Sequence, residues 1–520
     1  MVERHRIVLA KLRSMAVIGI DAFEIEIEAD IAEMLPSFTI VGLPDGAVRE
    51  SKERVMSAIK NCGFEFPSRK VTINMAPADM KKEGSAYDLP IAVGLLMASD
   101  QVELHNAAEY HIVGELSLDG SVKRIKGILS MAICARAMGL KGMIVPADNA
   151  EEAAVAEGLD IFPVSNLTEA LDFLSGKTAI KPTRIDLASL FNLSREYGID
   201  FKDVKGQEHV KRALLVAAAG SHNLLMIGPP GSGKTMLSRR LPTILPDLSL
   251  DEALETTKIH SVAGMLDSKT PLIATRPFRS PHHTISDAGL IGGGAYPRPG
   301  EVSLSHHGIL FLDELPEFGK AVLENLRQPM EDSRVTISRA AMSLSYPARF
   351  TLVAAMNPCP CGYYTDPRHT CSCSPPHIQK YMSRISGPLM DRIDIHIEVP
   401  ALSYDELAAK QPGEDSASMR KKVMAARKVQ SERFKGEKKV FCNAHMEPRH
   451  IRKYCELKPD SQTLLKNAID RLGLSARGYD RILKVSRTIA DLDGKENIES
   501  AHIAEAIQYR SLDRKLWMGG

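Results

Sequence analysis

The fold of this chain is decided by the stretch Leu224-Leu225-Met226-Ile227-Gly228-Pro229-Pro230-Gly231-Ser232-Gly233-Lys234-Thr235. An apolar, strand-like run breaks there into a glycine-rich turn, and residues 236–241 favour a helix. In the pattern G-x-x-x-x-G-K-[ST], backbone N–H groups surround the phosphates, the lysine binds the β- and γ-phosphate oxygens and the hydroxyl binds Mg²⁺. The sequence therefore predicts an ATP and Mg²⁺ site in a strand-loop-helix unit. The residues expected to hold the phosphates are Gly228, Pro229, Pro230, Gly231, Ser232, Gly233, Lys234 and Thr235.

Length and composition limit the classes of protein to consider. With 520 residues, of which 44% are hydrophobic, the chain can bury several cores, and roughly three domains are expected. Lys plus Arg (66) nearly balance Asp plus Glu (65), so contact with nucleic acid must come from local clusters. No run approaches the roughly 20 apolar residues of a membrane span, and we expect a cytoplasmic protein without membrane contact. Eight cysteines do not make a disulfide scaffold in a chain of this length.

The first 175 residues combine both secondary-structure periodicities. Apolar and acidic residues alternate in Phe23-Glu24-Ile25-Glu26-Ile27-Glu28, the period-two pattern of a half-buried strand. Asp88–Ala98 is an apolar run of helical length, and Asp119-Gly120 is a turn signal for a hairpin over 110–124. A mixed α+β unit is therefore expected. Further strands are expected at 38–41, 70–75 and 142–146, and further helices at 47–61 and 131–138.

A resemblance within this region is carried by two stretches, Lys82-Glu83-Gly84-Ser85-Ala86-Tyr87-Asp88-Leu89 and Gly114-Glu115-Leu116-Ser117-Leu118-Asp119-Gly120. Residues 14–174 resemble the proteolytic domain of Lon-type proteases, which implies a ribosomal-protein-S5-like fold. The serine nucleophile of that family falls on Ala86 and its lysine partner near Leu129. Neither side chain can act as nucleophile or base, and Ser85 is shifted by one position. We expect a catalytically dead domain that serves as a scaffold, a partner-binding module or a DNA-contact module.

Changes in composition mark the expected domain boundaries. Polar and turn-forming residues, among them Gly176-Lys177, Pro182 and Gly198, separate the first region from the phosphate-binding loop. After Pro400 the chain becomes helical and charged. The overall class is α/β, with an S5-like domain at 1–175, a linker at 176–200, an AAA+ P-loop core with a parallel sheet at 201–400 and a C-terminal helical lid at 401–520.

A second apolar strand pattern, His307-Gly308-Ile309-Leu310-Phe311-Leu312, ends in Asp313-Glu314. An Asp at a strand end can hold Mg²⁺, and the adjacent Glu can orient and polarise the water that attacks a phosphoanhydride. A solvated acidic pair is the ordinary alternative. Because a phosphate-binding loop lies about 80 residues upstream, we interpret Asp313 as a metal residue and Glu314 as a catalytic one.

A third strand pattern, at 350–356, ends in Asn357-Pro358. An amide there can hydrogen-bond both the γ-phosphate and the attacking water, as the sensor residue of AAA+ ATPases does; the alternative is an ordinary Asn-Pro turn. In the following Gly387-Pro388-Leu389-Met390-Asp391-Arg392-Ile393-Asp394, Arg392 is the candidate arginine finger for a neighbouring subunit. Arg384 is the second choice for that role, and a surface salt bridge is the plainer reading.

The order of these motifs and the residues within them resemble those of one family, the magnesium-chelatase-like AAA+ ATPases of the YifB and ComM type. The resemblance covers nearly the whole chain. This resemblance implies a ring-forming, hexameric, ATP-driven motor, similar to the ComM helicases that promote branch migration of DNA. It also implies that Gln207 lies near the adenine and that Arg477 senses the γ-phosphate from the lid. The motifs that carry it are Arg276-Pro277-Phe278-Arg279-Ser280-Pro281-His282-His283-Thr284, Gly300-Glu301-Val302-Ser303-Leu304-Ser305-His306-His307-Gly308 and Asn357-Pro358-Cys359-Pro360-Cys361-Gly362.

Two insertions are expected to touch DNA. Residues 280–299 contain Gly292-Gly293-Gly294 and suggest a mobile loop, and 331–339 alternate as one arm of a hairpin. Loops at these places line the channel in related AAA+ helicases. The candidates for contacts with the phosphate backbone are Arg279, Arg298, Arg334 and Arg339.

Four of the cysteines form two C-x-C pairs separated by nine residues. Thiolates paired this closely can complete a tetrahedral Zn²⁺ shell, although C-x₂₋₄-C is the usual spacing in zinc sites. Reduced structural cysteines are the alternative. The predicted zinc ligands are Cys359, Cys361, Cys371 and Cys373.

Three classes of function remain open from the sequence. The first is an ATP-driven helicase or translocase on single-stranded or branched DNA, assembled as a homo-hexamer. The second is a magnesium-chelatase motor subunit, which the Lon-like domain and the lack of a D-x-S-x-S motif in the sequence disfavour. The third is a protein-remodelling or regulatory AAA+ module that uses its dead protease domain to hold peptides.

Overall fold

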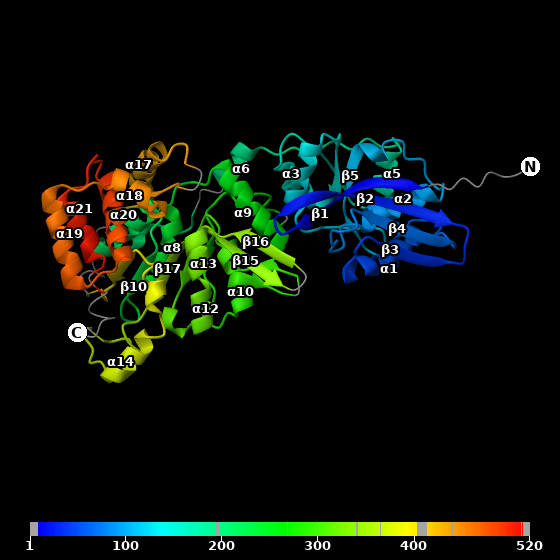
Figure 1. Cartoon of the computed structure of the whole chain (residues 1–520). Coiled ribbons are helices and arrows are strands. Elements are labelled where there is room, and N and C mark those ends of the chain that lie inside the picture. The colour runs from blue at the N-terminus through cyan, green and yellow to red at the C-terminus, as the bar shows by residue number, and fades with distance from the viewer. Residues whose placement is uncertain are drawn as a thin grey trace, which may run out of the picture. The chain divides into compact units, whose positions relative to one another are not determined.

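The computed structural model describes residues 9–193, 197–267, 269–294, 296–339, 342–364, 366–402, 413–437, 440–510 and 512. The chain divides into two compact units, each with its own sheet (Figure 1). The first unit comprises Met1–Ser194 and Ala253–Ala274, and the second comprises Arg195–Glu252 and Thr275–Gly520. Residues that precede the phosphate-binding loop and residues that follow it are therefore both found in each unit.

The first unit is built on a seven-stranded mixed sheet with the order β3-β4-β2-β1-β5-β8-β9. β1 pairs antiparallel with β2, β2 pairs antiparallel with β4, and the outer neighbours on both sides pair in parallel. Alternating residues of β4, namely Val71, Ile73 and Met75, are buried, as the period-two pattern predicts. The strands are β1 (Ala10–Ile18), β2 (Asp21–Ala32), β3 (Ser37–Val41), β4 (Lys70–Ala76), β5 (Tyr110–Ile112), β8 (Gly142–Pro146) and β9 (Asp160–Val164).

Helix α2 (Asp88–Ala98) is the central helix of this unit, because nearly all of its residues are buried. A Cβ on Gly94 would lie 3.4 Å from Ala29 and 3.5 Å from Leu12, so the helix packs directly on β1 and β2. Helices α1 (Gly46–Asn61), α2 and α3 (Ile128–Met138) confirm the helices expected at 47–61, 88–98 and 131–138. The unit also contains helices that were not predicted, namely α4 (Ala150–Ala154), α5 (Leu167–Leu174), α6 (Leu187–Leu193) and the C-terminal part of α9 (Leu250–Ala263).

One expectation for this unit needs correction. The hairpin expected over 110–124 is shorter, with β6 (Glu115–Leu116) pairing with β7 (Val122–Lys123). Tyr110–Ile112 is buried at every position, so it has no solvent-exposed face and forms an inner parallel strand between β1 and β8. The polar connection expected at 176–200 contains helix α6.

The residues at the Lon-type catalytic positions are buried and apolar. Ala86 is 7% exposed and Leu129 is fully buried. The neighbouring Ser85 donates a hydrogen bond through its Oγ to the carboxylate of Glu115, and the buried Lys82 donates to the carbonyl of Pro77. The hydroxyl of Ser85 is thus paired with an acid.

The second unit contains a five-stranded parallel sheet with the order β11-β14-β17-β10-β18. The strands β10, β14 and β17 are buried at every residue, as expected for parallel strands covered on both faces. The phosphate-binding loop follows β10, which lies between β17 and β18. The strands are β10 (Leu224–Ile227), β11 (Phe278–Arg279), β14 (Ile309–Leu312), β17 (Thr351–Met356) and β18 (Ile395–Glu398).

Short helices and two small antiparallel ribbons surround this sheet. The segment 280–299, expected as a mobile loop, contains α10 (Asp287–Ile291) and the ribbon of β12 (Gly292–Gly293) with β13 (Arg298–Pro299). Leu290 is fully buried, so this expectation was wrong for part of the segment, which has an apolar anchor. The predicted hairpin arm is β15 (Arg334–Arg339), paired with β16 (Met342–Pro347). The remaining helices of the core are α7 (Glu208–Gly220), α8 (Lys234–Arg240), α11 (Glu301–Leu304), α12 (Lys320–Asn325), α13 (Arg327–Asp332), α14 (Pro375–Met382) and α15 (Gly387–Met390).

The C-terminal helices share one hydrophobic core with the parallel sheet. Met419 and Val423 from α17 and Ile482 from α20 belong to the same buried cluster as the strands and α7. At its other end α17 is tied to α7 by a hydrogen bond from Gln430 Nε2 to the carbonyl of Ala219, 3.1 Å long. The helices are α17 (Ser416–Arg433), α18 (Pro448–Tyr454), α19 (Pro459–Leu472), α20 (Ala476–Leu492) and α21 (Ser500–Gln508).

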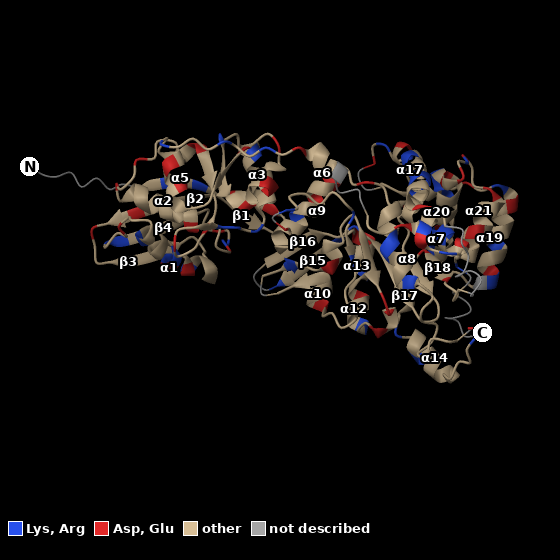
Figure 2. Ribbon diagram, turned by 180° about the vertical axis from the view of Figure 1, so that it is seen from behind, with Lys and Arg blue, Asp and Glu red and all other residues tan. Residues whose placement is uncertain are grey.

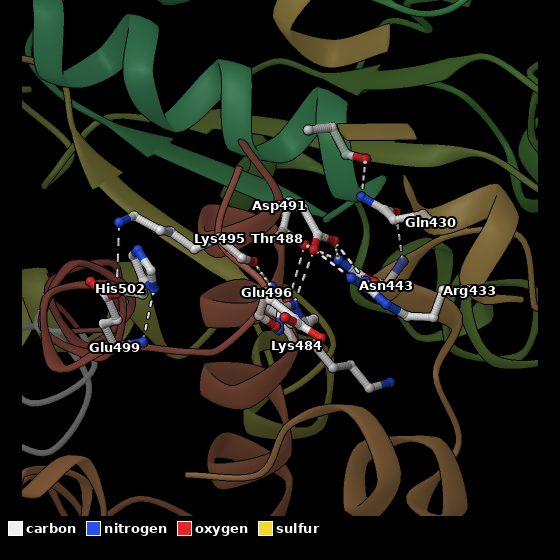
Figure 3. Close-up of polar contacts among 12 residues, drawn as sticks. Gln430, Arg433, Asn443, Lys484, Thr488, Asp491, Lys495, Glu496, Glu499 and His502 are labelled. Carbon is white, nitrogen blue, oxygen red and sulfur yellow. Dashed lines mark hydrogen bonds and ion pairs between the residues drawn. The ribbon is translucent and has the colours of Figure 1, made fainter. Parts of the chain in front are cut away.

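A buried carboxylate organises these helices (Figure 3). Asp491 accepts hydrogen bonds from both terminal nitrogens of Arg433 (2.7 and 2.5 Å) and from Asn443 Nδ2 (2.8 Å). Arg487 adds a further bond of 3.1 Å, and Asn443 donates to Thr488 at 3.0 Å. Because a buried carboxylate is stable only when its lone pairs are satisfied, this network fixes the mutual positions of α17 and α20.

Charged residues of both signs are interspersed along the elements of each unit (Figure 2). The near balance of basic and acidic residues in the whole sequence is thus found within each unit as well. Helix α17 is an exception, with six Lys or Arg residues and one Glu. None of the helices described in the structure is long and apolar enough to cross a membrane.

The ion pair between Asp88 and Arg54 supplies a stability prediction. Arg54 donates to both carboxylate oxygens (2.6 and 3.1 Å), and Asp88 also accepts from the backbone N–H of Leu116 at 3.2 Å. Removal of the carboxylate in Asp88→Ala would leave the guanidinium partly buried without its partner. We expect the first unit to lose about 3 kcal/mol of unfolding free energy, measured by hydrogen exchange of β4 and α2 amides. The exposed Glu26, paired with Lys11, is the control: Glu26→Ala should leave exchange unchanged, and equal losses would refute the prediction.

Candidate nucleotide-binding site

The phosphate-binding loop bends between β10 and α8 at positions that require glycine. Gly231 and Gly233 have φ angles of 76° and 90°. A Cβ on Gly228 would lie 2.1 Å from the carbonyl oxygen of Val399, so the loop passes too close to the neighbouring backbone for any side chain. The glycines thus give the loop the tight curvature needed to turn successive N–H groups inward.

Lys234 is 8% exposed and lies inside this loop. Its Nζ donates to the carbonyls of Gly228 (2.7 Å) and Pro229 (2.9 Å), and Asn357 Oδ1 lies 3.3 Å away. Burial lowers the pKa of Lys234, and the nearby Asp313 opposes that shift. The amine is therefore held at the centre of the loop by weak, neutral acceptors that phosphate oxygens can replace.

Thr235 and Asp313 meet at the carboxyl edge of the sheet. Thr235 Oγ1 donates to Asp313 Oδ2 at 2.6 Å, which brings together a hydroxyl and a carboxylate, both oxygen ligands suited to Mg²⁺. The next residue, Glu314, has a left-handed backbone with φ of 53°, so its side chain leaves the strand direction. Its carboxylate is 57% exposed and lies 3.1 Å from His283 Nδ1.

Gln207 contacts the same loop from the start of α7. It is buried with a left-handed φ of 55°, and its Nε2 donates to the carbonyls of Ser232 (2.9 Å) and Pro400 (3.1 Å). Gln207 therefore joins the phosphate-binding loop to the segment that follows β18.

The three arginine candidates lie in different environments. Arg392 is 6% exposed, donates to the carbonyl of Pro388 at 2.6 Å and pairs with the carboxylate of Glu331. Arg384 is half-exposed and pairs with Glu317 at 2.7 Å. Arg477 is exposed in the first turn of α20. Among the hydrogen bonds and ion pairs of the described residues, none joins Arg392 or Arg477 to the cluster around Lys234.

A cavity of about 370 Å³ adjoins the phosphate-binding loop. Gly228 and Pro229 form one side of it, and Pro400 and Ala401 form another. No motif in the sequence marks this cavity, because its walls come from separate segments of the chain between Ile227 and Leu512. A volume of this size is typical of small-ligand pockets, and the cavity adjoins the loop predicted to hold the phosphates of a nucleotide. Its third wall consists of Pro358, Tyr364, Asp366, Pro367 and Arg368.

The four clustered cysteines converge in space. Their sulfur atoms all lie within 4.8 Å of one another, and the pairs Cys359–Cys361, Cys359–Cys371 and Cys361–Cys371 are 3.3, 3.7 and 3.5 Å apart. Tetrahedral zinc with Zn–S bonds of about 2.3 Å separates its sulfurs by about 3.8 Å. The two C-x-C pairs, despite their narrow spacing, thus offer a four-thiolate set of nearly the right size. The backbone N–H of Cys361 also donates to Cys373 Sγ at 3.4 Å.

A buried network missed by the sequence reasoning joins the sheet to α20. His222 lies between Asp394 Oδ2 (3.1 Å) and Thr488 Oγ1 (2.8 Å), and Arg481 pairs with the same aspartate. Burial lowers the pKa of His222 to about 3 and that of Arg481 to about 9. The only sequence signal was the position of Asp394, two residues after Arg392.

The candidate DNA-contacting arginines divide into two groups. Arg279 is held by Glu301, with two hydrogen bonds of 2.7 Å, and is therefore already paired. Arg298, Arg334 and Arg339 are exposed on the two ribbons. Gly293, which pairs with Arg298, would meet Arg339 Nη2 at 3.2 Å if it carried a Cβ, so these ribbons lie against each other.

Comparison with known proteins agrees with this architecture. Three family models match: magnesium chelatase, subunit ChlI, at residues 200–407; subunit ChlI of Mg-chelatase at 27–149; and the ChlI C-terminal model at 413–510. YifB of Salmonella typhimurium is 45% identical, and the competence protein ComM of Haemophilus influenzae 43% identical, each over 98% of both chains. Lon protease 2 of Bacillus subtilis is 32% identical over 28% of this chain and 27% of its own.

The fold, the phosphate-binding loop and these matches define the class, an AAA ATPase of the magnesium-chelatase type. The chain belongs to the ChlI-like family that includes YifB and ComM. ATP hydrolysis is the activity that this class implies.

Lys234 provides the first test of the site. The variant Lys234→Ala removes the one cation that the loop surrounds, and we expect the affinity for MgATP to fall about 10- to 100-fold, as measured by calorimetry. Arg239→Ala, which removes an exposed cation of the same helix, is the matched control and should bind as the parent does. Equal affinity of the Lys234 variant and the parent would place the phosphates elsewhere.

Proposed function

We propose that this protein is an ATP-driven motor that acts on single-stranded or branched DNA as a ring, a homo-hexamer, in the manner of a branch-migration helicase. The observation that carries the ATPase part is the convergence of Lys234, Thr235, Asp313 and Asn357 at one edge of the parallel sheet. The DNA part draws on the 43% identity to a protein named for competence and on the exposed arginines of the ribbons.

In this proposal the residues around the loop divide the work of hydrolysis. Lys234 exchanges the carbonyls of Gly228 and Pro229 for β- and γ-phosphate oxygens. Thr235 and Asp313 would hold Mg²⁺, which neutralises charge on the transferred phosphoryl group when bound. Glu314 orients the attacking water and accepts its proton, a role for which its exposed carboxylate and its position beside Asp313 are suited.

Three further residues act on the γ-phosphate. Asn357, 3.3 Å from Lys234, senses it from the same subunit. Arg477 approaches from the first turn of α20, where it is exposed. Arg392 acts in a neighbouring subunit's site, and this requires that it exchange Glu331 for the phosphate.

The hairpin of β15 and β16 is suited to the DNA backbone. One of its faces is exposed and carries hydroxyls joined across the strands, with Ser338 and Ser343 2.9 Å apart and Thr336 and Ser345 3.5 Å apart. Arg334 and Arg339 are exposed on the same hairpin. Hydroxyls and guanidiniums are the groups that most often contact DNA phosphates, while Val335 and Ile337 anchor the opposite face in the unit.

The four cysteines complete the proposal as a structural zinc site. Four thiolates leave no open coordination position, and closed sites of this kind stabilise folds rather than catalyse reactions. The ligands are Cys359, Cys361, Cys371 and Cys373, and the cation is proposed to hold the loop that follows Asn357.

A second candidate function is that of a chelatase motor subunit, favoured by the three magnesium-chelatase family models. It would hydrolyse ATP without a response to DNA. Stimulation of ATP hydrolysis by forked or Holliday-type DNA separates the two functions, and stimulation by a protein substrate alone would instead favour a remodelling ATPase.

Glu314 tests the chemical step. In Glu314→Gln the site keeps its shape and its metal residues, so MgATP binding should persist while kcat falls about 100- to 10,000-fold. The assay is steady-state phosphate release, and strand exchange on a Holliday-type substrate should stop with it. Glu317→Gln, which alters a nearby acid on the same turn, is the control. Strand movement by Glu314→Gln at the parent rate would refute the coupling.

The hairpin arginines test the DNA contact. The double variant Arg334→Ala/Arg339→Ala should lose DNA stimulation of the ATPase while still binding MgATP. The slope of log affinity against log salt should become shallower by about 1.5 to 2, because two phosphate contacts disappear. Arg49→Ala, an exposed arginine of α1, serves as the control. An unchanged salt slope would show that the hairpin does not contact the DNA backbone.

A further inference from the structure

The segment between Asn357 and α14 connects two sites that the sequence presents as separate. It begins at the residue that contacts Lys234, and between its first and second cysteine pairs it supplies Tyr364, Asp366, Pro367 and Arg368 to the cavity beside the phosphate-binding loop. Its four cysteines converge on one another. The same loop thus carries both a cation site and one side of a ligand pocket.

Direct contacts fasten this cysteine loop, defined here as Cys359–Cys373, to the nucleotide site. Gly362 has a φ of 86°, and a Cβ there would lie 2.6 Å from Cδ and 2.8 Å from Cγ of Pro230. The cysteine loop therefore packs on the phosphate-binding loop with no room for a side chain. On its far side Arg368 Nη1 donates to the carbonyl of Leu402 at 2.8 Å.

A sulfur atom also touches the pocket wall. The backbone N–H of Tyr364 donates to Cys359 Sγ at 3.3 Å, so a predicted cation ligand fixes the backbone of a residue that lines the cavity. Among its described residues the cysteine loop contains no helix or strand. Turn hydrogen bonds, such as that from Gly362 N–H to the carbonyl of Cys359, shape the loop locally, and contacts between the two cysteine pairs join its two ends.

We propose that a tetrahedral thiolate-bound cation, with zinc as the fitting ion, shapes the wall of the nucleobase pocket, so that affinity for a nucleoside triphosphate depends on occupancy of the four-cysteine site. The inference rests on the proposed binding of ATP at the phosphate-binding loop. Tyr364 supplies an aromatic face for the base, and Pro358 and Pro367 supply apolar contacts.

The dependence is selective for the base. Lys234, Thr235 and the backbone N–H groups of the phosphate-binding loop are the groups proposed to bind the phosphates, and none of them belongs to the cysteine loop. The cysteine loop packs on the phosphate-binding loop at Pro230, which has no N–H group. Loss of the cation should therefore lower the affinity for ligands that carry a base much more than the affinity for ligands that consist of phosphates alone. This asymmetry distinguishes a shaped pocket from a general loss of folding.

The experiment compares MgATP with magnesium tripolyphosphate, which lacks a base, on the full-length zinc-loaded protein. In Cys371→Ser/Cys373→Ser, zinc measured by mass spectrometry should fall from one per chain to none. The Kd of MgATP, from calorimetry, should rise about ten-fold, while that of tripolyphosphate stays within about two-fold. The matched control is Cys62→Ser/Cys134→Ser, which replaces two cysteines outside the cluster. Reversible removal of zinc from the parent protein with a chelator should reproduce the effect.

A second variant keeps the test decisive if the cysteine variants do not fold. Tyr364 is 37% exposed, and Tyr364→Ala should retain zinc but lose the preference for MgATP over tripolyphosphate about ten-fold. A parent protein without zinc, zinc loss with unchanged MgATP affinity, or an equal loss for both ligands would each overturn the inference. Failure of the parent to bind either ligand would instead refute the nucleotide site itself.

Discussion

The parallel pairing of β10, β17 and β14 is the constraint on which the candidate site depends. Ile227 pairs with Met356, and Leu312 pairs with Ala354, so the residues that follow these strands emerge at one edge of the sheet. Ligands of open parallel sheets bind at this edge, where the carboxyl ends of the strands meet. The contact of Thr235 with Asp313 and that of Lys234 with Asn357 follow from this register. A slip of the pairing would separate them, however well each motif were preserved.

The same constraint explains what the sequence could and could not predict. Gly228–Thr235, Asp313 and Asn357 each follow an apolar strand directly, so a local pattern was enough to single them out. Tyr364 and His222 have no such pattern. Tyr364 lines the cavity together with Gly228 and Pro229, and His222 contacts Asp394 and Thr488, all more than 100 positions away in the chain. The prediction of a hairpin over 110–124 was wrong because the partners of a strand cannot be read from its own residues. The buried strand Tyr110–Ile112 pairs with β1 and β8 and not with the segment that follows it.

The environment of Arg392 adds a condition to its proposed role. Its side chain is buried beside Glu331, and the same turn carries Asp394, which contacts His222 and Arg481. Because burial holds His222 neutral, Asp394 has Arg481 of α20 as its cationic partner. Any displacement of α20 therefore acts on the turn that holds Arg392. The proposed finger Arg392 and the proposed sensor helix α20 are thus joined within one chain through the carboxylate of Asp394.

The shared hydrophobic core limits how the C-terminal helices can move during a nucleotide cycle. Met419, Val423 and Ile482 are buried together with the strands, and exposing each such side chain costs about 1.5 to 3 kcal/mol. Complete separation of these helices from the sheet would also break the bond from Gln430 to Ala219 and the pair of Arg481 with Asp394. If Arg477 senses the γ-phosphate as proposed, the nucleotide would act at the exposed start of α20, by a small rotation of the helix about its buried half. Such a rotation reaches Arg481 one turn later, and through it the turn that carries Arg392.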